Sequence, residues 1–201
     1  MLACSGQPPA ASPPAPPPSA PPAAAEPALQ DREWGVLRSP AHGIKLAAPE
    51  ARAWVSPSLG PSGSSWELRH EPTGSSLSLR RWRASRLLQV DDCERELRAR
   101  VPNLAERDET SLVAERSVRA PAGFLTRIAL FSLPGREKRL QGQVLAVGAG
   151  VGECIAAVAH TECSTEAELA ERLRLFDTVF AHLRLIHVED RVPAPEPLPP
   201  G

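Results

Sequence analysis

The four cysteines are the side chains in this sequence best suited to chemistry. Cys4 lies near the start, whereas Cys93, Cys154 and Cys163 fall among apolar segments. Thiol and imidazole groups bind zinc, but only His160 and Cys163 have the short spacing of paired zinc ligands. No fourth ligand follows nearby, so the sequence predicts no metal site.

A catalytic role for Cys93 is the next possibility. A helix N-terminus favours the reactive thiolate, but the neighbouring carboxylates of Asp92 and Glu94 disfavour it. The sequence shows no Ser–His–Asp order, paired-carboxylate motif or phosphate-binding loop of the known kinds. We therefore expect no catalytic residue and no cofactor, and an enzyme with a dispersed active site is the remaining catalytic alternative.

Three glycines at alternate positions, Gly148, Gly150 and Gly152, could suggest a nucleotide-binding loop. Such a loop needs a helix directly after the glycines, because the helix N-terminus holds the pyrophosphate. An apolar strand-like run follows here instead. The glycines therefore predict a hairpin turn.

A run of cations around one aromatic residue is the best candidate for a binding surface. It comprises Arg80, Arg81, Trp82, Arg83 and Arg86. On a strand, alternate residues share a face, so Arg80 lies with Trp82 and Arg81 with Arg83. The run indicates an anionic partner, lipid headgroups or a strand edge protected by charge. A formal net charge of −1 argues against nucleic acid as the main partner.

The longest patterned stretch predicts a hairpin followed by a helix. Residues 140–147 and 154–160 are apolar at most positions, as in strands covered on both faces. Thr165 and Glu168 match a capping box that starts a helix of about twenty residues. Its apolar face comprises Leu169, Leu173, Phe176, Phe180, Leu183 and Ile186.

The other predicted elements complete an α+β fold. Strands are expected at 43–49, 65–70, 76–82, 112–118 and 125–133, and a helix from Asp91, capped by Asp91 and Glu94, to Val101. Trp66, Leu68, Leu77 and Leu79 alternate toward the inside of a hairpin. This order predicts a largely antiparallel sheet of about six to seven strands packed with two helices.

The helix that contains Cys93 suggests a disulfide. Cys93, Leu97 and Val101 share the helical face that should pack on the sheet. Cys154 lies on a buried strand, so Cys93–Cys154 is the preferred pair, with Cys163 as the alternative partner of Cys93. Buried thiols without a disulfide are the other interpretation.

The 23 prolines divide the chain into three parts, because most lie near its ends. Residues 1–30 contain a Pro/Ala-rich tether and residues 193–201 a Pro-rich tail, both too poor in bulky apolar residues to offset their ordering entropy. Residues 31–192 are expected to form a single α+β domain. No apolar run is long enough to span a membrane.

Leu2-Ala3-Cys4, followed by Ser5, Gly6 and the tether, resembles the lipobox of bacterial lipoproteins. The resemblance implies lipidation of Cys4 and a membrane-anchored protein that faces the periplasm or the cell exterior. The charged and hydrophobic parts of a signal peptide are missing, which a start codon assigned too far downstream would explain. The alternative is an incidental Cys4 in a cytoplasmic chain.

The order of strands and helices resembles the PsbP-like fold, which includes bacterial envelope lipoproteins and photosystem accessory proteins. That resemblance implies a binding or assembly module without a catalytic centre. We therefore expect a non-enzymatic envelope lipoprotein whose partner is another envelope protein. The alternative is a cytoplasmic interaction module or secretion-chaperone-like adaptor, and the third is the enzyme with a dispersed active site.

Overall fold

The computed structural model describes residues 33–57, 65–83, 88–119, 124–135 and 139–186. Cys4, Arg86 and both predicted tails lie outside these residues. The elements are β1 (Trp34–Ser39), β2 (Ile44–Pro49), η2 (Ala51–Ala53), β3 (Trp54–Val55), β4 (Ser65–His70), β5 (Ser75–Arg83), α1 (Val90–Arg100), β6 (Leu112–Arg119), β7 (Leu125–Pro134), β8 (Leu140–Gly150), β9 (Glu153–Cys163), α2 (Glu166–Ala181) and β10 (Arg184–Leu185).

A seven-stranded antiparallel sheet forms the centre of the molecule, in the order β3-β4-β5-β9-β8-β7-β6. Its longest hairpin joins β8 to β9, with Gly150 opposite Glu153. The turn between them contains Gly152 at φ 70°, which glycine adopts without steric cost. The hairpin turn predicted from the glycines is confirmed, as are the α+β class and the two helices.

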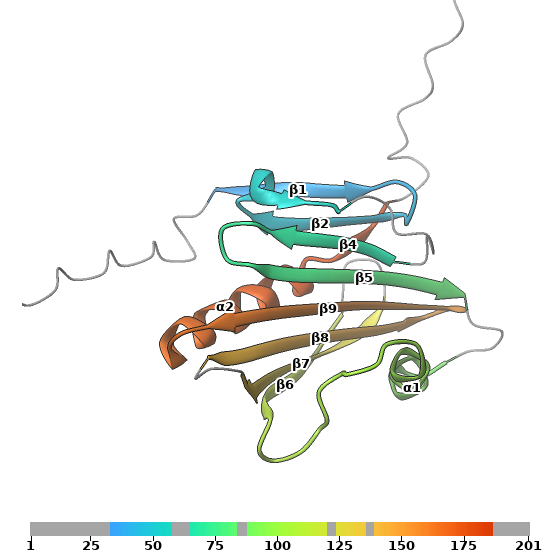
Figure 1. Ribbon diagram of the computed structural model, residues 1–201. Coiled ribbons are helices and arrows are strands. Elements are labelled where there is room, and N and C mark those ends of the chain that lie inside the picture. The colour runs from blue at the N-terminus through green and yellow to red at the C-terminus, as the bar shows by residue number, and fades with distance from the viewer. Residues whose placement is uncertain (1–32, 58–64, 84–87, 120–123, 136–138, 187–201) are drawn as a thin grey trace, which may run out of the picture.

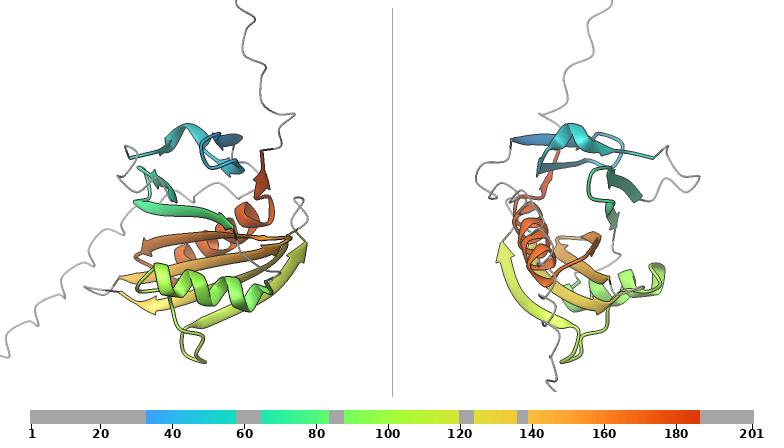
Figure 2. Two further views of the ribbon diagram at one scale, coloured as in Figure 1. Left: turned by 90° about the vertical axis from the view of Figure 1, so that its right-hand side faces the viewer. Right: turned by 60° about the vertical axis from the view of Figure 1, so that its left-hand side comes forward.

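Helices cover both faces of this sheet (Figures 1 and 2). α2 packs over β7, β8 and β9 on one face, and α1 packs over the same strands on the other. Because β8 and β9 are covered on both sides, their side chains are apolar at consecutive positions rather than at alternate ones. The inward-facing residues of the β4–β5 hairpin, Trp66, Leu68, Leu77 and Leu79, are buried as predicted.

A second, three-stranded sheet was not predicted from the sequence. It has the order β1-β2-β10 and covers the β3–β5 end of the molecule, away from α1 and β6 (Figure 1). Its inner residues Ile44, Leu46 and Ala48 join the same apolar core as α2. The small sheet therefore closes one end of the α2-side core.

The predicted end of the long helix is wrong. α2 has 16 residues and ends at Ala181, and His182 leaves the helical conformation at φ −103°, ψ 12°. Leu183 is buried outside the helix, and the Ile186 N–H donates to the Gly43 carbonyl at 2.8 Å. The chain leaves the helix because β10 completes the small sheet.

The predicted cap of α1 is also wrong. The helix begins at Val90, and the Asp92 carboxylate accepts a hydrogen bond from the Gln89 N–H at 3.1 Å. Glu94, which was expected to help cap the helix, is buried and contacts arginines instead.

Within the described residues, no helix is long and apolar enough to cross a membrane.

Candidate functional site

Polar side chains converge where the β4–β5 turn meets β9 and α2. They line a small cavity together with apolar groups. The lining residues are Pro49, Glu50, Trp54, His70, Thr73, Ser75, Arg172, Leu175 and Phe176. The space inside it for water-sized molecules is about 20 Å³, which is room for about one water.

His70 is the central residue of this network. It is 5% exposed and its ring lies 4.9 Å from that of Trp54. Its Nε2 is 3.1 Å from Glu50 Oε2, and its Nδ1 is 2.8 Å from Thr73 Oγ1. The order carboxylate, imidazole, hydroxyl is that of nucleophilic hydrolases.

Further hydrogen bonds occupy the Thr73 hydroxyl. It accepts from the Ser75 N–H at 3.3 Å and donates to Ser75 Oγ at 2.9 Å, in addition to its contact with His70. A nucleophile needs a free approach to a substrate carbonyl, and small-molecule pockets measure about 300–1,000 Å³. A saturated hydroxyl beside a cavity of about 20 Å³ favours a structural role for these groups.

Arg172 connects this network to the helix. Its guanidinium donates to the Thr73 carbonyl at 3.1 Å and to Thr161 Oγ1 at 3.2 Å, and it pairs with Glu168 one turn earlier on α2. Thr161 Oγ1 in turn lies 2.9 Å from Ser75 Oγ. The β4–β5 turn, β9 and α2 are thereby held in one arrangement.

A larger groove lies beside the same turn. Its lining residues are Gly74, Ser76, Leu133, Gln141, Gly142, His160, Thr161 and Glu162, around a volume of about 260 Å³. Gln141 Nε2 donates to Glu162 Oε1 at 2.9 Å, and His160 Nδ1 lies 3.4 Å from Gln143 Nε2. Partial burial lowers the pKa of His160 below its ordinary value, so the imidazole is neutral at pH 7. We call these eight residues the β5–β9 groove.

Gln143 neighbours His160 of this groove and is itself held in place. The side chain is 1% exposed, and its Oε1 accepts a hydrogen bond from the Ala105 N–H at 2.7 Å. It therefore ties the segment after α1 to the middle of β8. The groove can offer a partner hydrogen-bond donors and acceptors from a rigid sheet.

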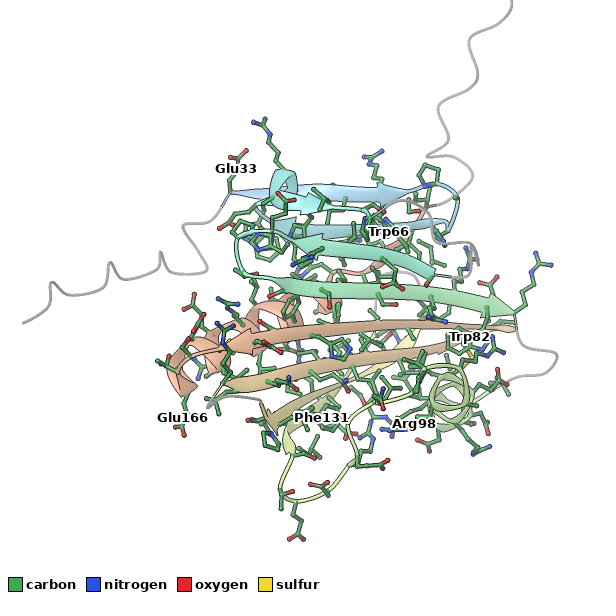
Figure 3. All side chains as sticks on the ribbon, viewed as in Figure 1. Glu33, Trp66, Trp82, Arg98, Phe131 and Glu166 are labelled. Atoms are coloured by element: carbon green, nitrogen blue, oxygen red, sulfur yellow. A yellow bond between two sulfur atoms is a disulfide. The ribbon has the colours of Figure 1, made fainter. Side chains whose placement is uncertain are left out.

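The segment after α1 is also fixed by charge. Glu94 is 6% exposed, and its carboxylate accepts hydrogen bonds from Arg98 at 2.9 Å and Arg107 at 2.9 Å, with Arg127 at 3.4 Å. Burial opposes ionisation of Glu94, but the hydrogen bonds and charges of Arg107 and Arg98 outweigh it and lower the pKa of the carboxyl. Arg98 lies at α1 in Figure 3.

Four residues of the sequence-predicted cationic run lie on two faces of the sheet, and the fifth, Arg86, lies outside the described residues. Arg80 and Trp82 face the α1 side of the sheet, and Arg81 and Arg83 face the other side, as strand alternation requires. Arg81 pairs with Glu153 at 2.6 Å. Trp82, at the end of β5 next to α1 (Figure 3), donates to Glu96 at 2.8 Å, and Arg100 lies 5.3 Å from the centre of its ring.

The disulfide and the buried Cys163 thiol lie in different apolar cores. Cys93 of α1 and Cys154 of β9 form a disulfide with a Cα–Cα distance of 5.7 Å, the preferred pair of the sequence analysis. Cys163 is a buried thiol in the α2-side core, 3.9 Å from Thr161 Oγ1. The described residues contain no group of three or more His, Cys, Asp or Glu side chains that could hold a metal ion.

Sequence reasoning missed the His70 network and the Glu94 cluster. Glu50, His70 and Arg172 come from three distant segments, and only the fold brings them together. A local signal did exist for Glu94. An acidic residue one position after Cys93 on the sheet-facing side of a helix has to be either exposed or paired.

Comparison with known proteins supports the fold. No protein-family model and no curated protein matches the sequence. The solution structure of cyanobacterial PsbP (CyanoP) from Synechocystis matches with a TM-score of 0.52 and 16% identity, over 76% of this chain and 92% of that chain. A crystal structure from Bacteroides thetaiotaomicron matches with a TM-score of 0.46 and 13% identity, over 79% of this chain and 50% of that chain. The first likeness shows a PsbP-like fold.

Proposed function

We propose that this protein is a lipid-anchored protein of the bacterial cell envelope whose α+β domain binds another envelope component without catalysing a reaction. Lipidation at Cys4 would tie the chain to the membrane through the Pro/Ala-rich tether. The domain would then act as a binding or assembly module at the membrane surface.

The Cys93–Cys154 disulfide is the observation that carries this proposal. Both cysteines are fully buried, at the contact between α1 and the sheet. Disulfides persist in the periplasm and outside the cell, whereas cytoplasmic thiols are kept reduced. A structural disulfide therefore favours the envelope over the cytoplasmic adaptor.

The β5–β9 groove is the surface that we assign to the partner. It combines neutral and charged polar groups on a rigid sheet. The exposed imidazole of His160 and carboxylate of Glu162 can exchange hydrogen bonds with a polypeptide. The saturated His70 network lies beneath the same turn and supports the groove rather than a reaction.

The compartment is tested by the intact mass of the protein purified from the membrane fraction of its native host. We expect a mature form that starts at Cys4 and carries a diacyl or triacyl group. A soluble form that retains Met1 and reduced cysteines would overturn the proposal and leave the cytoplasmic adaptor in its place.

The partner surface is tested by site-specific photocrosslinking in the envelope. A crosslinking residue at His160 should yield a discrete adduct with another envelope component. The same residue at Val151, which is 89% exposed at the tip of the β8–β9 hairpin, is the matched control. Equal adducts from both positions, or none from either, would contradict the assignment.

A further inference from the structure

The outer face of the small sheet carries a row of three cations. The strand register places Arg38 of β1 opposite Lys45 of β2, and Lys45 opposite Arg184 of β10. Directly opposed residues on neighbouring strands share a face, with Cβ atoms about 4.5–5.5 Å apart. The row therefore crosses all three strands of the sheet.

Apolar groups continue this face along β1. Alternation puts Trp34 and Val36 on the same side as Arg38, and they are 38% and 55% exposed. Val36 lies opposite Ala47 of β2. One end of the face is thus aromatic and aliphatic, and the other is cationic; we call Trp34, Val36, Arg38, Lys45, Ala47 and Arg184 the outer face.

Two of the three cations, Arg38 and Arg184, have no acidic partner among the residues that the structure describes. Like charges directly opposite each other destabilise a sheet. By contrast, Arg98, Arg107 and Arg127 all lie within 3.4 Å of Glu94. Glu33 precedes β1, at the end of the strand away from Arg38 (Figure 3).

We propose that the outer face docks on an anionic lipid surface. Its cations would contact headgroup phosphates, and Trp34 and Val36 would enter the boundary between headgroups and acyl chains. Tryptophan is enriched at that depth, and basic residues are attracted to anionic leaflets. The inference deepens the proposed function, which supplies the membrane.

The position of the outer face along the chain is consistent with docking on a membrane. β1 is the first described strand after the tether that follows Cys4. An anchor on the same chain raises the effective concentration of the outer face at the bilayer. A face of modest affinity is then sufficient to orient the domain.

The test uses the full 201-residue chain with Cys4→Ser, so that binding does not depend on lipidation. The chain is mixed with vesicles of phosphatidylcholine alone or with phosphatidylglycerol, and bound protein is measured by flotation. We expect binding to the anionic vesicles only, weakened by added salt. Arg38→Gln with Arg184→Gln should lower the partition coefficient about 25-fold, since each cation near an anionic surface contributes about fivefold.

A control variant removes the same charge elsewhere. Arg69→Gln with Arg174→Gln alters exposed arginines of β4 and α2, and it should leave binding within about twofold of the parent chain. Trp34→Ala should lower binding and abolish most of the vesicle-induced blue shift of tryptophan fluorescence.

Two results would overturn the inference. One is absence of binding to anionic vesicles, and the other is an equal loss in the control variant. A chain that ignores vesicles but self-associates or binds an acidic protein through Arg38 and Arg184 would assign the outer face to a protein partner instead. The intact mass from the native membrane reports on lipidation separately, so the two proposals fail independently.

Discussion

The Cys93–Cys154 disulfide should dominate the stability of the domain. The bond joins residues 61 positions apart and links α1 to the central strand β9. A cross-link that closes a loop of this length lowers the entropy of the unfolded chain enough to contribute about 4 kcal/mol. We predict that the double variant Cys93→Ala, Cys154→Ala loses about this amount of unfolding free energy.

Thermal unfolding with and without dithiothreitol measures this effect. A loss of about 4 kcal/mol corresponds to a decrease in Tm of about 8–16 °C for a domain of this size. The reductant should lower the Tm of the parent chain and leave that of the double variant unchanged. Cys163→Ala is the matched control: it removes the remaining buried thiol of the domain and should keep the response to the reductant.

Thiol titration of the unfolded, unlipidated chain gives an independent reading. Of the four cysteines two are in the disulfide, so two thiols should react before reduction and four after it. Four reactive thiols in the chain purified without reductant, together with a Tm insensitive to dithiothreitol, would refute the reasoning. The argument for an envelope location would then lose its main support.

Three further predictions concern single residues. Glu94→Gln should cost about 3 kcal/mol, because it removes a buried carboxylate that pairs with Arg98, Arg107 and Arg127, whereas the exposed Glu109→Gln should change stability by less than about 0.5 kcal/mol in chemical denaturation. Gly142→Ala should cost about 1–3 kcal/mol, since its Cβ would lie 2.6 Å from Leu169 Cδ1, and a Tm equal to that of the parent would contradict the packing. Hydrogen bonds from Thr110 and Ser111 lower the pKa of Asp108 to about 2, so its contribution is present above the ordinary carboxyl pKa and is lost as pH falls toward 2. The difference in Tm between the parent and Asp108→Ala should accordingly shrink over that range.

Most of the main sheet could be predicted because helices cover its central strands on both faces. β8 and β9 are apolar at consecutive positions because α1 and α2 cover opposite sides of them, and this pattern is present in the local sequence. The alternation in β4 and β5 likewise reports one buried face. Cys93 could be matched to Cys154 because a helical face and a buried strand gave two independent constraints.

The small sheet left no comparable pattern. β10 has two residues, too few for alternation, and its pairing with β2 spans about 140 positions of the sequence, from Lys45 to Arg184. Leu183 and Ile186 continued the helical spacing of α2, so the sequence extended the helix through them. Tertiary pairing overrode a local periodicity that was correct up to Phe180.

The polar networks could not be predicted because their residues are also far apart in the sequence. His70 meets Glu50 and Thr73 because η2, β3 and the β4–β5 turn are placed together by the sheets, and Arg172 reaches the turn from 99 positions away. The arginine run of β5 was visible, but the acids that contact it, Glu153 at Arg81 and Glu96 at Trp82, became apparent only from strand and helix packing.

The formal net charge of −1 does not show which cations pair with acids and which do not. Arginines near α1 and β5 face acids at short distances, and Arg116 of β6 does the same with Asp177 of α2. Arg38 and Arg184 of the outer face have no such acid among the described residues and lie on one face. Surface association depends on such local charge rather than on the total. A nearly neutral chain can therefore bind an anionic bilayer through one cationic face, in a salt-sensitive way.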